Sequence, residues 1–315
     1  MPKHPPGPAP IDVPDALAAS LTAFLGEAGR VWAAGLPSLA GALLESWELR
    51  PDGPPAHGVV GLVVPVLRAD GTPAVLKLQP VDEETAGEPV ALRAWAGRGA
   101  VRLLAHDPAS GSMLLERLDP DRSLLAVPDD LAALRVLAEI LAGLTERQAP
   151  PGLRRLADLA DGLLAGTPPA LAVLADPADR RLLADCAAAV REVRDEPGDR
   201  LLHWDLHYGN VLAPAGPDGR APWLAIDPKP LAGDPGFELL PALGNRWDDL
   251  TATGDVPRAL RRRFDLMTDV LALDRARATS WTLGRILQNA LWDLDDGAHA
   301  IDPAQRAVAE ALLAR

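Results

Sequence analysis

The alternation of apolar and polar residues divides the chain into two parts of different character. Between residues 47 and 116, short apolar runs separated by turn residues predict strands at 47–49, 59–67, 74–78, 101–104 and 112–116. Beyond residue 119, leucine, alanine and valine recur at helical spacing, which predicts helices at 131–147, 153–165, 178–193 and 256–273. The pattern therefore indicates an α+β fold of two lobes: a small N-terminal lobe over 1–117, built on an antiparallel sheet, and a mostly helical C-terminal lobe over 118–315.

Turn and capping residues refine this outline. Asp70 and Gly71 lie between two predicted strands, which is the signature of a β-hairpin. Residues 1–10 are rich in proline and are expected to form an extended arm. Further helices are predicted at 13–25, 36–44, 88–97 and 281–296.

Composition narrows the classes of partner. The formal net charge of −13 argues against a nucleic-acid partner, which requires a basic face. It is compatible with a cationic small molecule, although surface carboxylates also serve solubility alone. The single cysteine, Cys186, excludes an intramolecular disulfide framework and suits a reducing cytoplasm. No run of about 18 apolar residues is present, so no membrane span is expected, and the proline-rich N-terminus does not resemble a signal peptide.

The segment Leu201–Asn210, which reads LLHWDLHYGN, carries the strongest chemical signal. Asp205 and Asn210 are five residues apart, as in the catalytic loop of phosphoryl-transfer enzymes, where the carboxylate accepts the proton of the attacking hydroxyl. A short apolar run over 223–226, read as a buried strand, ends in Asp227. Asn210 and Asp227 would supply oxygen ligands for Mg²⁺, and Asp205 would act as the catalytic base.

A second group of residues is expected to bind the nucleotide. Lys77 lies on a predicted strand, on the face opposite Leu76 and Leu78. The chain's only other lysines are Lys3 and Lys229, so a lysine retained here indicates that a compact ammonium is needed.

The partner of this lysine is left open between two glutamates. In kinases a helix glutamate holds the strand lysine, and Glu88 follows Lys77 by 11 residues. Pro89 suits the first turn of a helix and so places Glu88 at the helix start, which leaves Glu84 as the alternative. Gly58 and Gly61 precede a predicted strand and form a candidate loop over the phosphates, although glycines between strands usually mark ordinary turns.

A rival interpretation starts from the histidines. His203, Asp205 and His207 could belong to the metal cluster of a hydrolase, since histidine and carboxylate ligands at short spacing suit zinc. The remaining histidines form no second cluster, and this interpretation leaves Asn210 and Lys77 without a role. Phosphoryl transfer accounts for more of the residues.

Together these segments resemble the aminoglycoside phosphotransferase family, small-molecule kinases with a protein-kinase-like fold. The resemblance covers 63–125, 201–247 and 281–297, and it is strongest to the branch of streptomycin 6-phosphotransferases and hydroxyurea-resistance kinases. Ala-Val-Leu-Lys-Leu at 74–78 and Met-Leu-Leu-Glu-Arg-Leu-Asp-Pro at 113–120 are typical of that branch. The resemblance implies ATP and Mg²⁺ as cofactors, and it places Glu116 and Leu118 in the hinge that meets the adenine.

These patterns indicate the chemical class of the acceptor. The branch and the negative charge favour a polar, polyhydroxylated and cationic compound such as streptomycin, and a sugar or amino-sugar kinase is the alternative. A pseudokinase is disfavoured because the full set of catalytic residues is present. Trp204 stands where the family usually has a small residue, and it either narrows or supports the acceptor pocket. The residues predicted to contact the acceptor are His207, Lys229, Asp248, Asp249, Trp292 and Asp293.

Overall fold

The computed structural model describes residues 11–216 and 220–314, and the arm predicted over residues 1–10 lies outside them. The chain divides into two compact units. The first runs to Gly97 and resumes over Val101–Leu118, and the second comprises Arg98–Ala100 and the chain from Asp119 onward. In the described residues no helix is both long and apolar enough to cross a membrane.

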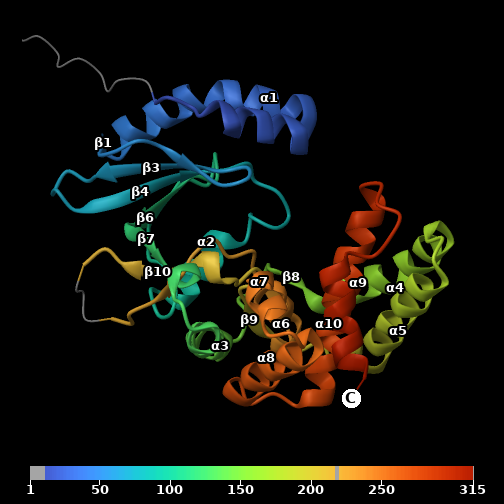
Figure 1. Cartoon of the computed structure of the whole chain (residues 1–315). Coiled ribbons are helices and arrows are strands. Elements are labelled where there is room, and N and C mark those ends of the chain that lie inside the picture. Colours follow the sequence, from blue (N-terminus) through green and yellow to red (C-terminus); the bar gives the residue numbers. More distant parts are fainter. Residues whose placement is uncertain (1–10, 217–219, 315) are drawn as a thin grey trace, which may run out of the picture. The chain divides into compact units, whose positions relative to one another are not determined.

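The first unit is an antiparallel sheet with helices on it (Figure 1). Its strands follow the order β1-β3-β4-β6-β5, and β2 pairs with β3. Side chains of β3 alternate between buried and partly exposed positions, as expected for a strand with one face on a core. The elements are α1 (Asp15–Ser46), β1 (Arg50–Pro51), β2 (Ala56–His57), β3 (Leu62–Leu67), β4 (Pro73–Leu78), α2 (Glu88–Trp95), β5 (Leu103–His106) and β6 (Met113–Glu116).

Helix α1 covers the sheet as one kinked helix, where the sequence predicts two separate ones. The kink lies at Gly26, whose φ of 60° is accessible to glycine at low cost. At Gly29 a side chain would collide with the carbonyl of Leu21, so the chain can fold back at this point only with glycine there. Leu17, Leu36 and Leu44 of α1 then share one core with the buried strand residues Leu62, Val64 and Leu76.

The strand predictions hold for the centre of the sheet and shift at its edges. The hairpin of β3 and β4 pairs in register from Leu62 with Leu78 to Leu67 with Pro73, around the turn at Asp70 and Gly71. The run predicted over 59–67 is interrupted, because residues 58–61 turn between β2 and β3 with the Gly58 N–H donating to the Gly61 carbonyl (3.0 Å). Residues 47–49 follow α1 without forming a strand.

The second unit is mostly helical, and two small sheets lie within it. One sheet has the order β11-β10-β7, and the other has the order β8-β12-β9. Its helices pack through contacts of α5 with α4 and α9, and of α8 with α3 and α10. The helices are α3 (Asp130–Thr145), α4 (Leu156–Val173), α5 (Pro177–Val193), α6 (Leu239–Gly244), α7 (Trp247–Ala252), α8 (Val256–Val270), α9 (Arg275–Asp295) and α10 (Pro303–Leu313).

The short elements of this unit frame the predicted catalytic loop. They are β7 (Leu118–Ser123), η1 (Leu124–Ala126), β8 (Arg154–Arg155), β9 (Arg200–Leu202), η2 (Tyr208–Asn210), β10 (Val211–Pro214), β11 (Leu224–Ala225), β12 (Leu231–Gly233) and η3 (Pro235–Glu238). Strand β9 leads into the loop, and β10 and β11 form the antiparallel hairpin that follows it.

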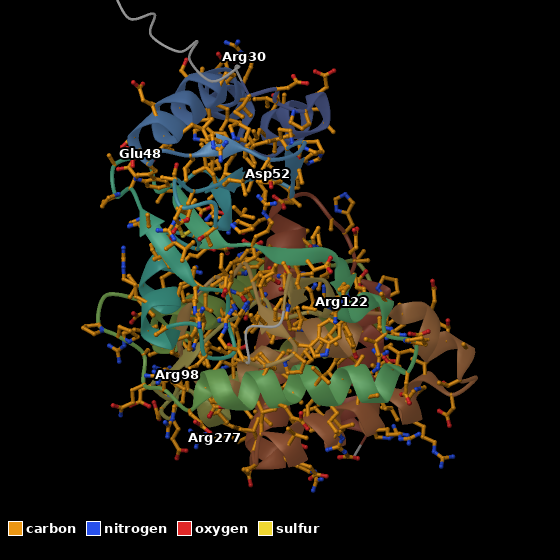
Figure 2. The ribbon with its side chains drawn as sticks, turned by 90° about the vertical axis from the view of Figure 1, so that its left-hand side faces the viewer. Arg30, Glu48, Asp52, Arg98, Arg122 and Arg277 are labelled. Atoms are coloured by element: carbon orange, nitrogen blue, oxygen red, sulfur yellow. The ribbon has the colours of Figure 1, made fainter. Side chains whose placement is uncertain are left out.

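Asp234 and Pro235 begin the short helix η3. The Asp234 carboxylate caps η3 by accepting from the Gly236 N–H (2.8 Å). The same carboxylate accepts from Arg277 of α9 (2.7 Å). Arg277 is labelled in Figure 2.

Candidate active site

Backbone hydrogen bonds tie the catalytic loop to the segment that carries Asp227. The Ile226 N–H donates to the Asn210 carbonyl (2.9 Å), so Asp227 directly follows a residue bonded to Asn210. The Asn210 side-chain N–H₂ donates to the Asp205 carbonyl (2.9 Å), which commits the amide nitrogen and leaves Oδ1 as the atom that could bind a metal. The structure therefore brings the two predicted metal ligands onto adjoining backbone, next to the predicted base.

The buried His203 side chain connects the catalytic loop to the segment before Asp227. Its Nε2 lies 3.0 Å from the Ile226 carbonyl and its Nδ1 accepts from the Asp205 N–H (3.4 Å). Complete burial lowers the pKa of His203 to about 4, so the imidazole is neutral near pH 7, donating through Nε2 and accepting through Nδ1. Through these two hydrogen bonds the ring links the loop to the segment that carries Asp227. His207 caps η2 by accepting from the Gly209 N–H (3.1 Å).

The first unit contains a buried ion pair. The Lys77 ammonium lies 2.7 Å from both carboxylate oxygens of Glu88, and both side chains are almost fully buried. Gln79 donates to the same carboxylate (2.6 Å). Glu88 is the first residue of α2, as Pro89 predicts, and it rather than Glu84 holds the strand lysine.

The other residues predicted for the nucleotide lie in the same unit. Gly58 and Gly61 close the turn between β2 and β3, and neither position is crowded around its Cα. Glu116 ends β6, where its carboxylate accepts from the Arg102 N–H (2.7 Å). Leu118 is buried at the start of β7. Their roles in adenine and phosphate binding stay predictions.

A cavity of about 350 Å³ opens beside the predicted base within the second unit. Asp205 and His207 line it together with Arg285 and Asn289 of α9. Its other wall comes from α6 and from α10 and the residue that caps it. The remaining lining residues are Leu240, Pro241, Gly244, Asn245, Asp302, Ala304, Gln305 and Val308.

The turn at one side of this cavity is held rigidly. Arg263, with only 1% of its surface exposed, donates to the carbonyls of Leu243 (3.0 Å) and Asn245 (2.7 Å). It also donates to both carboxylate oxygens of Asp130 (3.0 and 2.8 Å), so its charge is paired. The backbone beside Gly244 and Asn245 is thereby fixed before any ligand binds.

Of the residues predicted to contact the acceptor, His207 lines this cavity and Lys229 does not. Asp248, Asp249, Trp292 and Asp293 do not line this cavity in the part of the chain that the structure describes. Asp249 instead pairs with Arg246 (2.5 Å), and Trp292 is partly exposed and contacts Trp204. Sequence reasoning missed Arg285, Asn289, Asp302 and Gln305, and the only local signal among them was the helix start Asp302 and Pro303.

Comparison with known proteins identifies the family. The pattern of the aminoglycoside/hydroxyurea antibiotic resistance kinases matches residues 46–297. The chain belongs to this family. It is 60% identical over 302 residues to a streptomycin 6-kinase of Streptomyces glaucescens, covering 96% of this chain and 97% of that one. It is 56% identical to a hydroxyurea phosphotransferase of Kitasatospora aureofaciens, covering 97% of this chain and 87% of that one.

A solved structure supports the fold. An aminoglycoside phosphotransferase, crystallised as a ternary complex with ADP and hygromycin B, superposes with a TM-score of 0.54 at 13% identity. The superposition covers 88% of this chain and 98% of that one. The predicted kinase-like fold is thus confirmed. The hydrolase interpretation is not favoured, since the relatives are named as kinases and phosphotransferases.

In this kinase the residue before the predicted base has a strained backbone. Trp204 has a φ of 66° and Asp227 a φ of 60°, values that non-glycine residues rarely adopt. Each costs on the order of 1–3 kcal/mol and persists only where surrounding contacts enforce it. At Trp204 one such contact is Glu238, whose carboxylate accepts from the Trp204 N–H (2.9 Å).

The structure also explains the unusual Trp204. Its indole is buried and does not line the cavity. The guanidinium carbons of Arg154 and Arg285 lie 4.3 and 4.6 Å from its ring centroid, and Trp292 meets it edge-on at 6.0 Å. Trp204 therefore supports the cavity wall by holding Arg285 and does not narrow the cavity.

Glu238 predicts a pH dependence of stability. Burial raises the pKa of Glu238 from 4.5 to about 8, so the folded enzyme binds this proton more tightly than the unfolded chain does. The stabilisation is complete below pH 4.5 and is lost as the pH rises toward 8. The lowered pKa of His203 makes the folded state more stable as the pH rises. This contribution is complete above the ordinary histidine pKa of 6.5 and does not change at higher pH.

Between pH 6.5 and 8 the free energy of unfolding of the wild type should therefore fall relative to that of Glu238→Gln. The difference should change by up to about 1.4 kcal/mol per pH unit, because one proton separates the two states. Urea denaturation of both proteins at the two ends of this window measures it. Parallel profiles would show that Glu238 is ionised throughout.

Proposed function

We propose that this enzyme transfers the γ-phosphoryl group of ATP to a hydroxyl of an aminoglycoside, with streptomycin as the first candidate. The observation that carries the proposal is Asp205 on the wall of a cavity able to hold a small molecule. The carboxylate would accept the proton of the acceptor hydroxyl as that oxygen attacks phosphorus. The names of the relatives, streptomycin 6-kinase among them, support the choice of acceptor.

The residues present fit a magnesium ion. Asn210 offers an amide oxygen whose nitrogen is already bonded, and Asp227 offers a carboxylate, which are the hard oxygen ligands that Mg²⁺ prefers. Mg²⁺ held by these two residues would neutralise part of the charge of the ATP phosphates. The Lys77 and Glu88 pair in the first unit would hold the nucleotide phosphates, as the corresponding pair does in kinases.

Hydroxyurea is the second candidate, because a hydroxyurea phosphotransferase is nearly as similar to this chain. The cavity favours the larger compound, since 350 Å³ lies in the range of pockets that enclose drug-sized ligands. Release of ADP should be measured with streptomycin, hydroxyurea and glucosamine as separate acceptors. Stimulation by glucosamine alone would replace the proposal with an amino-sugar kinase.

We expect Asp302, which lines the cavity, to bind a cationic group of the acceptor. Asp302→Asn should raise the KM for streptomycin by about three- to fivefold, because an exposed ion pair contributes up to about 1 kcal/mol. The kcat and the KM for ATP should stay unchanged, since asparagine caps a helix as well as aspartate does and α10 keeps its N-terminus.

Asp293→Asn is the matched control on α9, at a position that the sequence favoured and the cavity does not include. Steady-state kinetics in low and high salt separate the two variants, because salt screens an exposed pair. A rise in KM for Asp293→Asn without one for Asp302→Asn would restore the sequence-based acceptor site.

A further inference from the structure

Lys229 lies beside the predicted base. Its ammonium nitrogen is 3.4 Å from Oδ2 of Asp205, with 38% and 25% of the two side chains exposed. Its backbone is held in place, because the Lys229 N–H donates to the His203 carbonyl (3.0 Å). The same histidine bonds to the carbonyl before Asp227, so one buried ring fixes the turn that carries both Asp227 and Lys229.

The type of residue is informative. Arginine fills almost all cationic positions of this chain, and the only lysines are Lys3, Lys77 and Lys229. An ammonium is a compact charge with three N–H donors on a flexible stem, which suits a contact that must move between oxygens during a reaction. A surface ion pair alone would not require this, since arginine forms such pairs throughout the second unit.

The distances place this ammonium within reach of the reacting phosphorus. The base must lie about 3 Å from the acceptor oxygen, and that oxygen must lie about 3–3.5 Å from phosphorus in the attacking geometry. A nitrogen 3.4 Å from Asp205 can therefore contact a phosphoryl oxygen after a small rotation of the lysine side chain. Charge on those oxygens is what a fixed cation stabilises during transfer.

We propose that Lys229 is a further catalytic residue, whose ammonium pairs with Asp205 in the resting enzyme and binds the phosphoryl oxygens during transfer. The inference rests on the proposed phosphotransferase function. In the step, the acceptor oxygen forms a bond to phosphorus as the bond from phosphorus to the ADP oxygen breaks. The acceptor proton moves to Asp205, and Lys229 keeps its own protons throughout. As Lys229 turns to the phosphoryl group, it releases the carboxylate that receives this proton.

The test compares Lys229→Met, Lys229→Arg and the wild type. Lys229→Met should lower kcat by about 10²-fold, as expected when one donor to the transition state is removed, and should leave both KM values within about threefold. Lys229→Arg keeps the charge and should recover about tenfold of that loss. Arg275→Met is the matched control, since it removes another ion-paired cation of the second unit, 2.6 Å from Asp269.

Binding provides a readout independent of turnover. Fluoroaluminate mimics the phosphoryl group in the transition state of transfer. MgADP should therefore bind more tightly in the presence of fluoroaluminate than alone, both to the wild type and to Arg275→Met. Lys229→Met should lose about 10²-fold of this enhancement while its affinity for MgADP alone is unchanged. Calorimetry without any acceptor gives both values, so this arm remains decisive even if the choice of streptomycin is wrong.

The outcomes separate the alternatives. A kcat within about threefold of the wild type for Lys229→Met overturns the proposal. A lowered kcat with full fluoroaluminate enhancement also overturns it, because Lys229 would then only orient Asp205. Should the methionine variant fail to fold, Lys229→Gln is assessed by the same two measurements. Failure of the wild type to phosphorylate any acceptor would instead refute the proposed function.

Discussion

Asp205→Asn should lower kcat by about 10²-fold or more while the affinity for MgATP stays within about twofold of the wild type. The reason is the proposed division of roles in the loop: Asp205 lines the cavity and would act as the base, whereas Asn210 and Asp227 would bind the metal. Removing a general base typically costs 10²–10⁴ in rate. Asparagine preserves the shape of the side chain, and the backbone bonds of Asp205 to His203 and Asn210 do not involve the carboxylate.

Two measurements are needed for this prediction, namely steady-state kinetics and a calorimetric titration with MgATP. The melting temperature serves as the control, because the exposed pair of Asp205 with Lys229 contributes little to stability. A large loss of MgATP affinity in Asp205→Asn would move this carboxylate to the metal site and refute its assignment as the base.

Asp227→Asn should weaken the binding of ATP about 10- to 100-fold in the presence of Mg²⁺ and leave binding in EDTA nearly unchanged. A buried or partly buried charge-assisted contact is worth about 1.5–3 kcal/mol, which corresponds to this range. Asparagine is the suitable replacement, because Asp227 has a φ of 60° and asparagine tolerates that conformation. Alanine at this position would mix backbone strain with the loss of the ligand.

Asp195→Asn is the control for a general loss of negative charge, since the Asp195 side chain is 96% exposed in the same unit. Titrations of both variants with ATP, in Mg²⁺ and in EDTA, give four affinities to compare with the wild type. Equal weakening with and without the metal would show that Asp227 supports the fold of the loop and does not bind Mg²⁺.

The proximity of the predicted catalytic residues to one another could be read from the sequence because the signal is local. Four residues separate Asp205 from Asn210, and Asp227 directly follows a short apolar run. These spacings can be read directly from the sequence. The buried partner of Lys77 was narrowed to two glutamates for the same reason, and the structure resolves it to Glu88. Pro89 fixed Glu88 at the start of its helix, yet that position still reaches the lysine.

The cavity beside Asp205 could not be predicted, because its lining comes from segments far apart in sequence. Asp205, Arg285 and Asp302 come together through the packing of α6, α9 and α10. The spacing of hydrophobic residues within one helix does not show how that helix packs against the others. Asp248 and Asp249 were predicted to contact the acceptor because the family resemblance and the negative charge favour a cationic compound, and their role stays a prediction.

Trp204 illustrates a different limit of sequence reasoning. A large residue beside the predicted base can fill a pocket or support its wall. The structure shows that Trp204 supports the wall, because the guanidinium groups of Arg154 and Arg285 lie over its ring.

The central claim is tested most directly by incubating the purified wild type with ATP, Mg²⁺ and streptomycin and identifying the product by mass spectrometry and phosphorus NMR. We expect streptomycin to gain one phosphoryl group as a phosphate monoester, with one ADP formed per product and no product from Asp205→Asn on the same time scale. Folded wild-type enzyme that binds MgATP and leaves streptomycin unmodified would contradict the proposed function.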